Sequence, residues 1–415
     1  MGRRTVQGVC GTARGDRSAG SMSVRLLNVK FSPNVGDGLL VLCMEERLRR
    51  STSDVSSIDL AGRTGYRSHD GRRELSMRIL ASMPPVVRPR IARAGLDAKL
   101  AFGLRRHYRD AIAGIGSLVL GGGNLLSDQD LNFPVKIAAA LEEADRARAR
   151  LAIHGCGVSS RWSRSGREML CAAFAANPPV HVAVRDRASK QAWDTFFASA
   201  AGREAVVVND PGVLASTLYR FDDPRPRPDR PVVAVGLMSD FAIRYHGFAS
   251  LSAQELAGWY LALIAELTAR GFEVCVFTNG SPEDRRFAKD LWASLAGRRR
   301  PVHVRLADVA LPVDLCRVVA GAGAVIAFRM HALIAAYSYG KPLVALKWDP
   351  KVEAFLDAVG LAGDQVDVVV SSPSDAVGIL ASVVDRGVDH ARRHDVLSRA
   401  GSEIEELAAA LSRSP

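Results

Sequence analysis

Short apolar runs alternate with amphipathic stretches along most of this 415-residue chain, and this repeated order of strand, turn and helix is what most restricts its fold. The rhythm predicts parallel sheets with helices on both faces. It runs through residues 23–221 and starts again at residue 232. Residues 222–231 between them contain four prolines. Proline-dense polar sequence resists helix and sheet alike, so this segment is the predicted linker.

The predicted fold class is therefore α/β, with two Rossmann-like doubly wound domains that face each other across a cleft. Residues 23–221 form the expected N-terminal domain and residues 232–385 the C-terminal domain, which carries the donor site. Residues 386–415 are expected to form a helical tail that packs back across the first domain. Residues 1–22 are arginine-rich and lack the apolar centre of a secretory signal, so we expect a disordered extension, with Met22 as a second candidate start.

Charge and cysteine content narrow the choice of partner and compartment. The net charge is +11, which favours an acidic ligand, substrate or surface. The six cysteines are scattered, without a CxxC pair, as is typical of reduced thiols in the cytoplasm. No apolar run approaches the roughly 20 residues that span a bilayer. We therefore expect a cytoplasmic protein, and its oligomeric state is left open.

A polar turn, Asn34-Val-Gly-Asp37, separates the first predicted strand from the first helix. Gly36 permits positive φ, and Asn34 or Asp37 can cap the helix. One interpretation is an ordinary N-cap loop. The other is a nest of backbone amides that binds an anion, with Asp37 as a proton acceptor. Residues 51–75, beyond this helix, are polar and are expected to be irregular.

Three glycines and an asparagine, Gly121 to Asn124, follow the predicted strand 117–120. Loss of side chains at Gly122 and Gly123 would let a ligand approach the backbone closely, although a tight turn explains the run equally well. The run is not GxGxxG, so a dinucleotide fingerprint is excluded. Asp128 and Asp130, which come next, are expected to be solvated loop carboxylates more than ligands.

Arg185 and Asp186 end another predicted strand. An exposed pair of this kind is often a surface ion pair that contributes little. Its position at the carboxyl edge of the sheet makes anion binding an equal alternative, because arginine grips carboxylate and phosphate with two hydrogen bonds. His154 also ends a predicted strand, and we expect it to be structural.

The stretch 326–351 contains the strongest functional signal. Arg329 and His331 fall where a strand gives way to a helix, and Asp349 and Lys351 fall just past the next strand. Both groups lie beyond the carboxyl ends of adjacent parallel strands, where open α/β sheets bind their ligands. A guanidinium, an imidazole, an ammonium and a helix N-terminus indicate a site for a small anion that undergoes proton transfer.

Taken in order, these motifs resemble those of the polysaccharide pyruvyl transferase family. The matching segments are Asn34 to Asp37, Gly121 to Gly123, Gly155 to Gly157, Val184 to Asp186 with Ser189, Asp210-Pro211, Arg329-Met-His331, Gly340-Lys-Pro342 and Asp349-Pro-Lys351. Two positions depart from the family pattern. Phe328 replaces a small serine, which we expect to alter the acceptor side of the pocket, and the turn at Gly155 lacks the usual Gln or Ser.

The resemblance implies a fold similar to the two-domain glycosyltransferase B architecture. It also implies transfer of a carboxyvinyl unit from phosphoenolpyruvate to a sugar, as in bacterial exopolysaccharide and cell-wall polysaccharide synthesis. His331 would act as general acid or base, with Asp37 as its catalytic partner. The expected substrate-binding residues are Arg329, Arg185, Lys351, Asn34, Gly36, Gly122, Gly123, Asn124 and Asp349. No cofactor is expected beside the donor, and no metal ligand set is visible.

Two other functions stay open. A glycosyltransferase that uses a nucleotide-sugar would need an acidic residue for the ribose hydroxyls, and Glu353 could supply it. A non-enzymatic nucleic-acid-binding module would need aromatic side chains among its basic residues, and aromatic residues make up only 6% of the chain. We therefore expect no nucleic acid.

Residues 76–109 mix apolar and basic side chains. An ordinary element with its apolar side inward is one interpretation. The other is a patch that lies on the anionic inner face of the membrane and meets a lipid-linked sugar acceptor. The sequence does not identify the acceptor sugar, its lipid or the ketal linkage.

Overall fold

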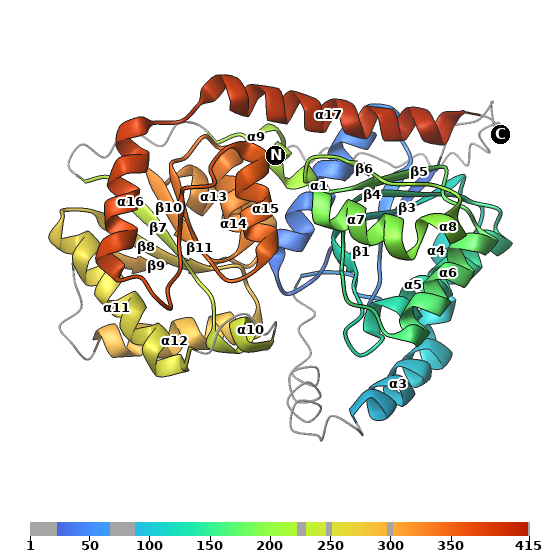
Figure 1. Ribbon diagram of the computed structural model, residues 1–415, viewed down its shortest axis with the longest axis horizontal. Helices are drawn as coiled ribbons and strands as arrows, with labels where there is room; N and C mark the ends of the chain where they lie inside the picture. The colour runs from blue at the N-terminus through green and yellow to red at the C-terminus, as the bar shows by residue number, and fades with distance from the viewer. Residues whose placement is uncertain (1–22, 67–87, 222–229, 246–250, 297–301, 414–415) are drawn as a thin grey trace, which may run out of the picture.

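The computed structural model describes residues 23–66, 88–221, 230–245, 251–296 and 302–413. The predicted N-terminal extension, most of the proline-rich linker and residues 76–87 of the basic segment lie outside the described residues. Two α/β units lie side by side, and a long last helix runs along both (Figure 1). The predicted α/β class with two doubly wound sheets is confirmed.

Six parallel strands form the sheet of the N-terminal domain in the order β2-β1-β3-β4-β5-β6. The strands are β1 (Val24–Asn28), β2 (Val55–Asp59), β3 (Ser117–Leu126), β4 (Arg150–Val158), β5 (His181–Val184) and β6 (Val206–Val207). The helices are α1 (Val35–Leu48), α3 (Arg88–Lys99), η1 (Leu100–Leu104), α4 (Arg105–Ile112), α5 (Asn132–Arg146), α6 (Arg164–Ala176), α7 (Arg187–Phe196), α8 (Ala198–Ala201), η2 (Pro211–Leu214) and α9 (Ala215–Leu218). Strands covered on both faces need apolar side chains at consecutive positions, which explains the apolar runs.

The sheet of the C-terminal domain is also parallel and six-stranded, in the order β12-β11-β10-β7-β8-β9. Its strands are β7 (Val232–Leu237), β8 (Glu273–Thr278), β9 (Val304–Leu306), β10 (Ala324–Ala327), β11 (Leu343–Leu346) and β12 (Gln365–Val366). Its helices are α10 (Asp240–Tyr245), α11 (Ala253–Ala269), α12 (Pro282–Ala296), α13 (Pro312–Ala320), α14 (Met330–Ser338), α15 (Pro350–Val359), α16 (Pro373–Arg386) and α17 (His390–Ser412).

The chain order reverses once in each sheet, between β1 and β3 and between β7 and β10. Open α/β sheets bind ligands beyond the carboxyl ends of the strands at such a reversal. Helix α1 follows β1 and helix α14 follows β10, so both helices begin at a reversal, and they contact each other across the domain interface. The backbone N–H of Val35 donates to the carbonyl oxygen of Asn279 at 2.8 Å and links the two domains there.

Helix α17 starts in the C-terminal domain and runs across the N-terminal one (Figure 1). Arg47 of α1 donates to the carbonyl oxygen of Gly401 at 3.3 Å and pairs with Glu405 at 2.7 Å. Near the end of the helix, Arg150 of β4 donates to the carbonyl oxygen of Leu411 at 3.0 Å. The second half of the last helix is therefore fixed to the N-terminal domain.

Several expected boundaries were wrong. Strand β3 does not stop at Leu120 but continues to Leu126, with a register shift against β4 between Gly123 and Leu126. The glycines take up this irregularity within the strand, because Gly122 and Gly123 adopt φ of 80° and 76°. The segment 51–75 was expected to be irregular, yet it contains the edge strand β2. An edge strand pairs on one side only and tolerates polar side chains, so its sequence signal is weak.

Candidate active site

The predicted site residues of the N-terminal domain cluster at the start of α1. Asn34 is the N-cap, and its Oδ1 accepts from the backbone N–H of Gly36 at 3.3 Å. Asp37 lies in the first helical turn. A Cβ atom on Gly36 would lie 2.5 Å from Cβ of His331 in the facing domain. Gly36 therefore allows the imidazole to contact the helix start directly, and no larger residue fits there without displacing it.

His331 is buried in the first turn of α14, with 8% of its surface exposed. Its Nδ1 lies 3.8 Å from Oδ1 of Asp37, and its Nε2 has no hydrogen-bond partner in the described part of the chain. Burial, followed by the charges of Arg185, Lys351 and Arg329, lowers the pKa of His331 to about 3. The imidazole is thus held neutral, with a free nitrogen among three cations.

Burial acts on Asp37 in the opposite sense and raises its pKa. A hydrogen bond from Ser32 and the charges of Arg63, Arg329 and Lys351 partly oppose that rise. A carboxyl group with a raised pKa beside a neutral imidazole can hold a proton for it. The structure therefore brings together the two residues that were predicted to be catalytic.

Arg185 reaches the same point from the end of β5, with its side chain 6% exposed. Its Nε lies 3.4 Å from Oδ2 of Asp186, and its Nη2 lies 3.5 Å from Oδ1 of Asn124. A Cβ atom on Gly157 would lie 2.6 Å from both Nη2 of Arg185 and Oδ1 of Asn124. Gly157 thus leaves space for the guanidinium of Arg185. Because this side chain is buried, the interpretation of Arg185 and Asp186 as an exposed surface ion pair is wrong.

Lys351 and Asp349 meet at the start of α15. Asp349 caps the helix and pairs with Nζ of Lys351 at 2.7 Å. The ammonium also lies 4.8 Å from the ring centre of Trp348. Burial lowers the pKa of Lys351, opposed by Asp349. Asp349 therefore positions the ammonium group of Lys351, and its carboxylate is less available to bind a ligand.

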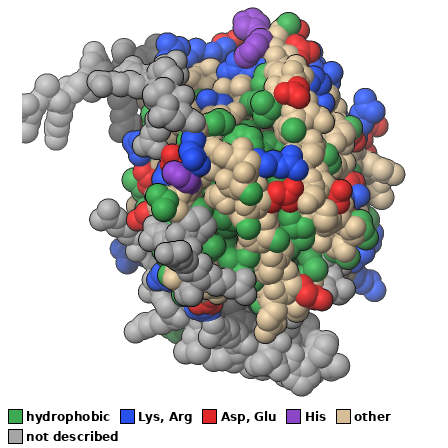
Figure 2. Space-filling view, turned by 90° about the vertical axis from the view of Figure 1, so that its left-hand side faces the viewer, with side chains coloured by type: hydrophobic (Ala, Val, Ile, Leu, Met, Phe, Trp, Pro, Cys, Tyr) green, Lys and Arg blue, Asp and Glu red, His purple; other side chains and the backbone are tan. Residues whose placement is uncertain are grey.

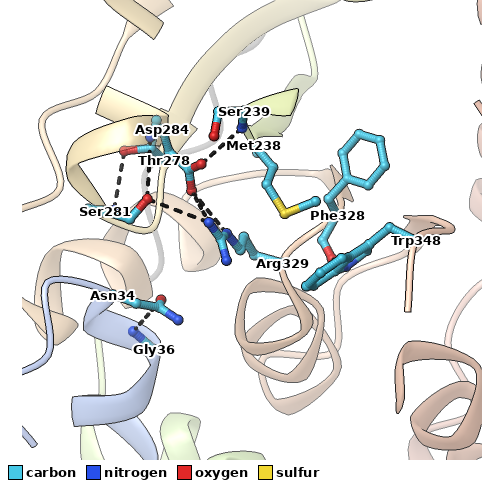
Figure 3. Close-up of polar contacts among 12 residues, drawn as sticks. Asn34, Gly36, Met238, Ser239, Thr278, Ser281, Asp284, Phe328, Arg329 and Trp348 are labelled. Atoms are coloured by element: carbon cyan, nitrogen blue, oxygen red, sulfur yellow. Dashed lines mark hydrogen bonds and ion pairs between the residues drawn. The ribbon is translucent and has the colours of Figure 1, made fainter. Parts of the chain in front are cut away.

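Arg329 is already engaged by a residue that the sequence did not indicate. Its Nε and Nη2 donate to Oδ2 of Asp284 at 2.9 and 2.6 Å, and the other oxygen of Asp284 accepts from the backbone N–H of Ser239 at 2.9 Å. Figure 3 shows the guanidinium turned toward Asp284, with Asn34 and Gly36 of α1 on the opposite side. The pair is buried, so Arg329 is fixed in orientation and its charge is largely compensated. The helix start Ser281-Pro-Glu-Asp284 is a capping pattern that could have drawn attention to this carboxylate.

The glycines of β3 have separate explanations. A Cβ atom on Gly122 would lie 2.0 Å from Cδ1 of Leu40, so this glycine allows α1 to pack closely on the sheet. A Cβ atom on Gly123 would meet nothing within 4 Å, so space remains beside that backbone. Of the two, only Gly123 has the surroundings expected of a ligand-facing backbone.

Phe328 does not line the pocket as we expected. Its side chain is fully buried in the C-terminal domain, 6.2 Å from the ring of Tyr260 between centroids. Its carbonyl oxygen accepts from Nε1 of Trp348 at 2.7 Å. The departure from the family pattern therefore affects packing, because Phe328, directly after β10, is buried in the core.

Three other acidic or basic candidates lie in local structural contacts. Oδ2 of Asp128 accepts from the backbone N–H of Ser163 at 2.7 Å. Glu353 pairs with Lys347 at 2.5 Å. His154 is fully buried, with Nδ1 3.3 Å from Nε2 of His181. Within the described ranges, no group of three or more His, Cys, Asp or Glu side chains is placed to hold a metal ion.

The buried histidines predict a loss of stability in acid. Burial lowers the pKa of His154 to about 3 and that of His181 to about 4, from an ordinary 6.5. Below pH 6.5 the unfolded chain binds protons on these histidines that the folded chain does not bind. The contribution of the neutral histidines to stability is therefore complete above pH 6.5 and falls as the pH drops toward 4. We expect the free energy of unfolding to fall with pH, and His154→Gln to reduce the slope by up to about 1.4 kcal/mol per pH unit.

Urea unfolding at several pH values between 7.5 and 5 measures this slope. The control is His394→Gln, because that side chain is 82% exposed and should leave the slope unchanged. An equal slope in the wild type and His154→Gln would show that His154 is not the source of the acid sensitivity.

Comparisons with known proteins give one family and one fold. A family model described as polysaccharide pyruvyl transferase matches residues 34–350. No curated protein is similar enough to count as a match. The structure titled S. aureus MnaA-UDP co-structure is 11% identical, with a TM-score of 0.53 over 95% of this chain and 99% of that one. A putative UDP-N-acetylglucosamine 2-epimerase from Listeria monocytogenes is 11% identical, with a TM-score of 0.54 over 94% and 96%. At these identities the likeness shows the fold alone, which is glycosyltransferase-B-like as expected.

Proposed function

We propose that this chain, which belongs to the polysaccharide pyruvyl transferase family, moves the carboxyvinyl group of phosphoenolpyruvate onto a sugar of a polysaccharide or its precursor, forming a pyruvate ketal. The observation that carries the proposal is the buried His331, with a free Nε2 among the charges of Arg185, Lys351 and Arg329. Phosphoenolpyruvate carries a carboxylate and a phosphate, so it needs several cations and a proton donor at one point.

The reaction balances without a further reactant. The methylene carbon of the donor takes a proton, and C2 becomes an oxocarbenium-like centre. A first sugar hydroxyl adds to C2 and loses its proton, the bond from C2 to the phosphate oxygen breaks, and a second hydroxyl closes the ketal. One of the two hydroxyl protons restores the acid that protonated the methylene carbon, and the other leaves with inorganic phosphate.

The three cations of the site act both on the bound donor and on the pKa of His331. Arg185 and Lys351 offset the charge of the bound donor and stabilise the leaving phosphate, while Arg329, oriented by Asp284, contributes its remaining N–H groups. The same cations depress the pKa of His331 in the free protein. An anionic donor offsets their field, so the pKa of His331 should rise when the donor binds and make the imidazole a competent acid. Asp37 is the nearby group that can exchange a proton with it.

Incubation of the protein with phosphoenolpyruvate and candidate oligosaccharides tests the proposal. Mass spectrometry should show an acceptor that gains pyruvic acid minus water, and one phosphate should appear for each acceptor modified. Protection from thermal unfolding by phosphoenolpyruvate but not by UDP separates this function from a nucleotide-sugar glycosyltransferase. Protection by UDP alone would reverse that choice.

A nucleic-acid partner is less well supported. On the end of the molecule formed by the C-terminal domain, basic and acidic side chains are interspersed, with hydrophobic ones between them (Figure 2). A polynucleotide backbone favours a continuous basic track, which that face does not offer.

Contact with an anionic membrane remains part of the proposal, through the described residues 88–109. Leu96, Leu100 and Leu104 pack into the N-terminal core, as the ordinary interpretation of this segment has it. Phe102 is 91% exposed, and Arg106 extends into solvent on the next turn. An outward aromatic ring beside basic residues fits an anionic lipid surface. No described helix is both long and apolar enough to cross a bilayer.

We expect the protein to float with anionic vesicles at low salt and to release them at high salt. Each basic residue near the surface contributes roughly 1 kcal/mol, so Phe102→Ser combined with Arg106→Gln should lower the bound fraction several-fold. Arg164→Gln, an exposed change on α6, is the matched control. Failure of the wild-type protein to float with anionic vesicles would indicate a soluble acceptor.

A further inference from the structure

A cavity of about 320 Å³ lies where α16 leads into α17, within the C-terminal domain. Its walls come from the end of α14, the turn at Lys341-Pro342, the end of α15 and the connection between α16 and α17. Figure 1 shows α16 and the start of α17 at the outer end of this domain. Small-molecule sites typically measure about 300–1,000 Å³, so the cavity has room for one compact ligand and not for an oligosaccharide.

This cavity lies at the far ends of two helices that begin at the donor site. His331 is in the first turn of α14, and Tyr337 near the end of that helix lines the cavity. Lys351 is in the first turn of α15, and Val359 at its end lines the cavity. At 1.5 Å per residue, the cavity lies roughly 9–12 Å along the helix axes from the donor-site residues. A ligand here would therefore leave those residues free to bind phosphoenolpyruvate.

Arg392, in the first turn of α17, supplies the cavity with a fixed cation. A Cβ atom on Gly360 would lie 2.4 Å from Cζ of Arg392, so the guanidinium lies directly over this glycine. Its Nη2 donates to the carbonyl oxygen of Ala358 at 3.3 Å, and no described carboxylate forms an ion pair with it. The remaining N–H groups are available to an anion, and arginine binds phosphate and carboxylate with two hydrogen bonds.

The charges of the whole lining favour an anion. The bases are Lys341, Arg386 and Arg392, and the acids are Asp364 and Asp389. Both acids have partners in the protein, because Asp364 pairs with Arg386 at 2.5 Å and Asp389 accepts from the backbone N–H of Arg392 at 2.9 Å. The lining thus carries a net positive charge, and its carboxylates are already engaged.

The position of the first turn of α17 does not depend on a ligand. Nε of Arg393 donates to the carbonyl oxygen of Ser338 at 2.8 Å, which holds this turn on the end of α14. The ring of Tyr337 packs edge-on against that of Phe355 at 6.1 Å between centroids. The walls that carry Arg392 and Tyr337 are therefore fixed in advance, which lowers the entropic cost of binding.

Apolar side chains form much of the remaining wall: Leu343, Val359, Leu361, Val383 and Val388. A bare inorganic ion would lose hydration beside such a wall without gaining a contact in return. An organic ligand with one anionic group would place its apolar part there and its charge on the guanidinium.

We propose that this cavity binds a small organic anion, with a phosphate or carboxylate group on Arg392 and an apolar body against Leu361, Val383 and Val388. The site is additional to the donor site and uses none of its cations. The inference therefore goes beyond the proposed function and does not depend on it.

NMR of the full-length protein with labelled Ile, Leu and Val methyl groups tests this site. The anionic probes are phenyl phosphate and benzoate, and the controls are phenol, which lacks the charge, and inorganic phosphate, which lacks the apolar body. At least one anionic probe should shift the signals of Leu361, Val383 and Val388, and the tighter probe identifies the anionic group. Phenol and inorganic phosphate should each bind about tenfold more weakly or worse. The signals of Val213 and Ile334, which lie beside the donor-site cations, report separately on binding there.

Two variants with matched controls locate the probe. Arg392→Gln keeps a donor for the carbonyl oxygen of Ala358 and should weaken binding roughly tenfold or more, because a hydrogen bond to a charged group is lost. Arg270→Gln, a half-exposed change at the end of α11, should bind as the wild type does.

Val388→Trp should fill the cavity from the partly exposed connection and abolish binding. Val384→Trp is its control, because this side chain is 44% exposed on α16 and does not line the cavity.

Several results would overturn the assignment. They are the absence of shifts at Leu361, Val383 and Val388, shifts confined to Val213 and Ile334, and equal binding by Arg392→Gln and Arg270→Gln. Phenol binding as tightly as both anionic probes would make the cavity an apolar site, and inorganic phosphate doing so would indicate an adventitious ion only. None of these results bears on transfer from phosphoenolpyruvate, which the acceptor assay tests.

Discussion

Replacement of His331 by Asn should lower the rate of pyruvyl transfer by on the order of 100-fold or more, the usual scale for a lost general acid or base. Asparagine is close in size and can occupy the space beside Gly36, so the fold should persist. The imidazole is neutral in the free protein and contributes no charge to donor binding, so affinity for phosphoenolpyruvate should change little. A fall in kcat with an almost unchanged KM for the donor is therefore expected.

Steady-state assays that follow phosphate release, together with calorimetric titration of the donor, measure the two quantities separately. His394→Asn, an exposed change on α17, controls for loss of a histidine as such. A His331→Asn variant with full turnover would remove the imidazole from the mechanism, whatever its surroundings.

Arg185→Ala should weaken binding of phosphoenolpyruvate at least tenfold. A hydrogen bond to a charged group contributes about 1.5–3 kcal/mol, and Arg185 is a buried cation at the donor site whose Nη2 is held only at 3.5 Å by Asn124. Arg329→Lys should act differently. Lysine retains the charge, but it cannot place two donors on Oδ2 of Asp284, so the variant should lose stability as well as affinity.

Calorimetric titration with phosphoenolpyruvate at fixed ionic strength measures the affinities, and thermal unfolding without ligand measures the stabilities. Arg164→Ala removes an exposed charge from α6 and controls for the change in net charge. Unchanged donor binding in both Arg185→Ala and Arg329→Lys would place the anion elsewhere in the molecule.

Much of this arrangement could be predicted because it depends on local pattern. Apolar runs followed by polar turns place residues at the carboxyl edge of a parallel sheet, whatever the neighbouring strands are. Asp37, Arg185, His331 and Lys351 all follow strands in this way, and the structure brings them to one point. The α/β class and the two domains follow from the same rhythm.

What could not be predicted depends on contacts between distant segments. Asp284 meets Arg329 across 45 positions, and no local pattern reports which carboxylate a guanidinium will find. Gly122 looked like a ligand-facing turn but makes room for Leu40, a distinction that only the packing of α1 on the sheet reveals. Phe328 follows the same rule, because its burial depends on packing against distant residues such as Tyr260.

Helix α17 has a consequence for how the two domains can move. The chain passes from the N-terminal to the C-terminal domain between residues 221 and 230, and it returns through α17. Two crossings define an axis, so the domains can rotate about a line but cannot separate freely. Glu403 lies on this returning helix and accepts from the backbone N–H of Asn209 in the N-terminal domain at 2.8 Å. Opening of the interface to admit substrates would thus be a hinge rotation, with helix α17 as one of the two connections about which the domains turn.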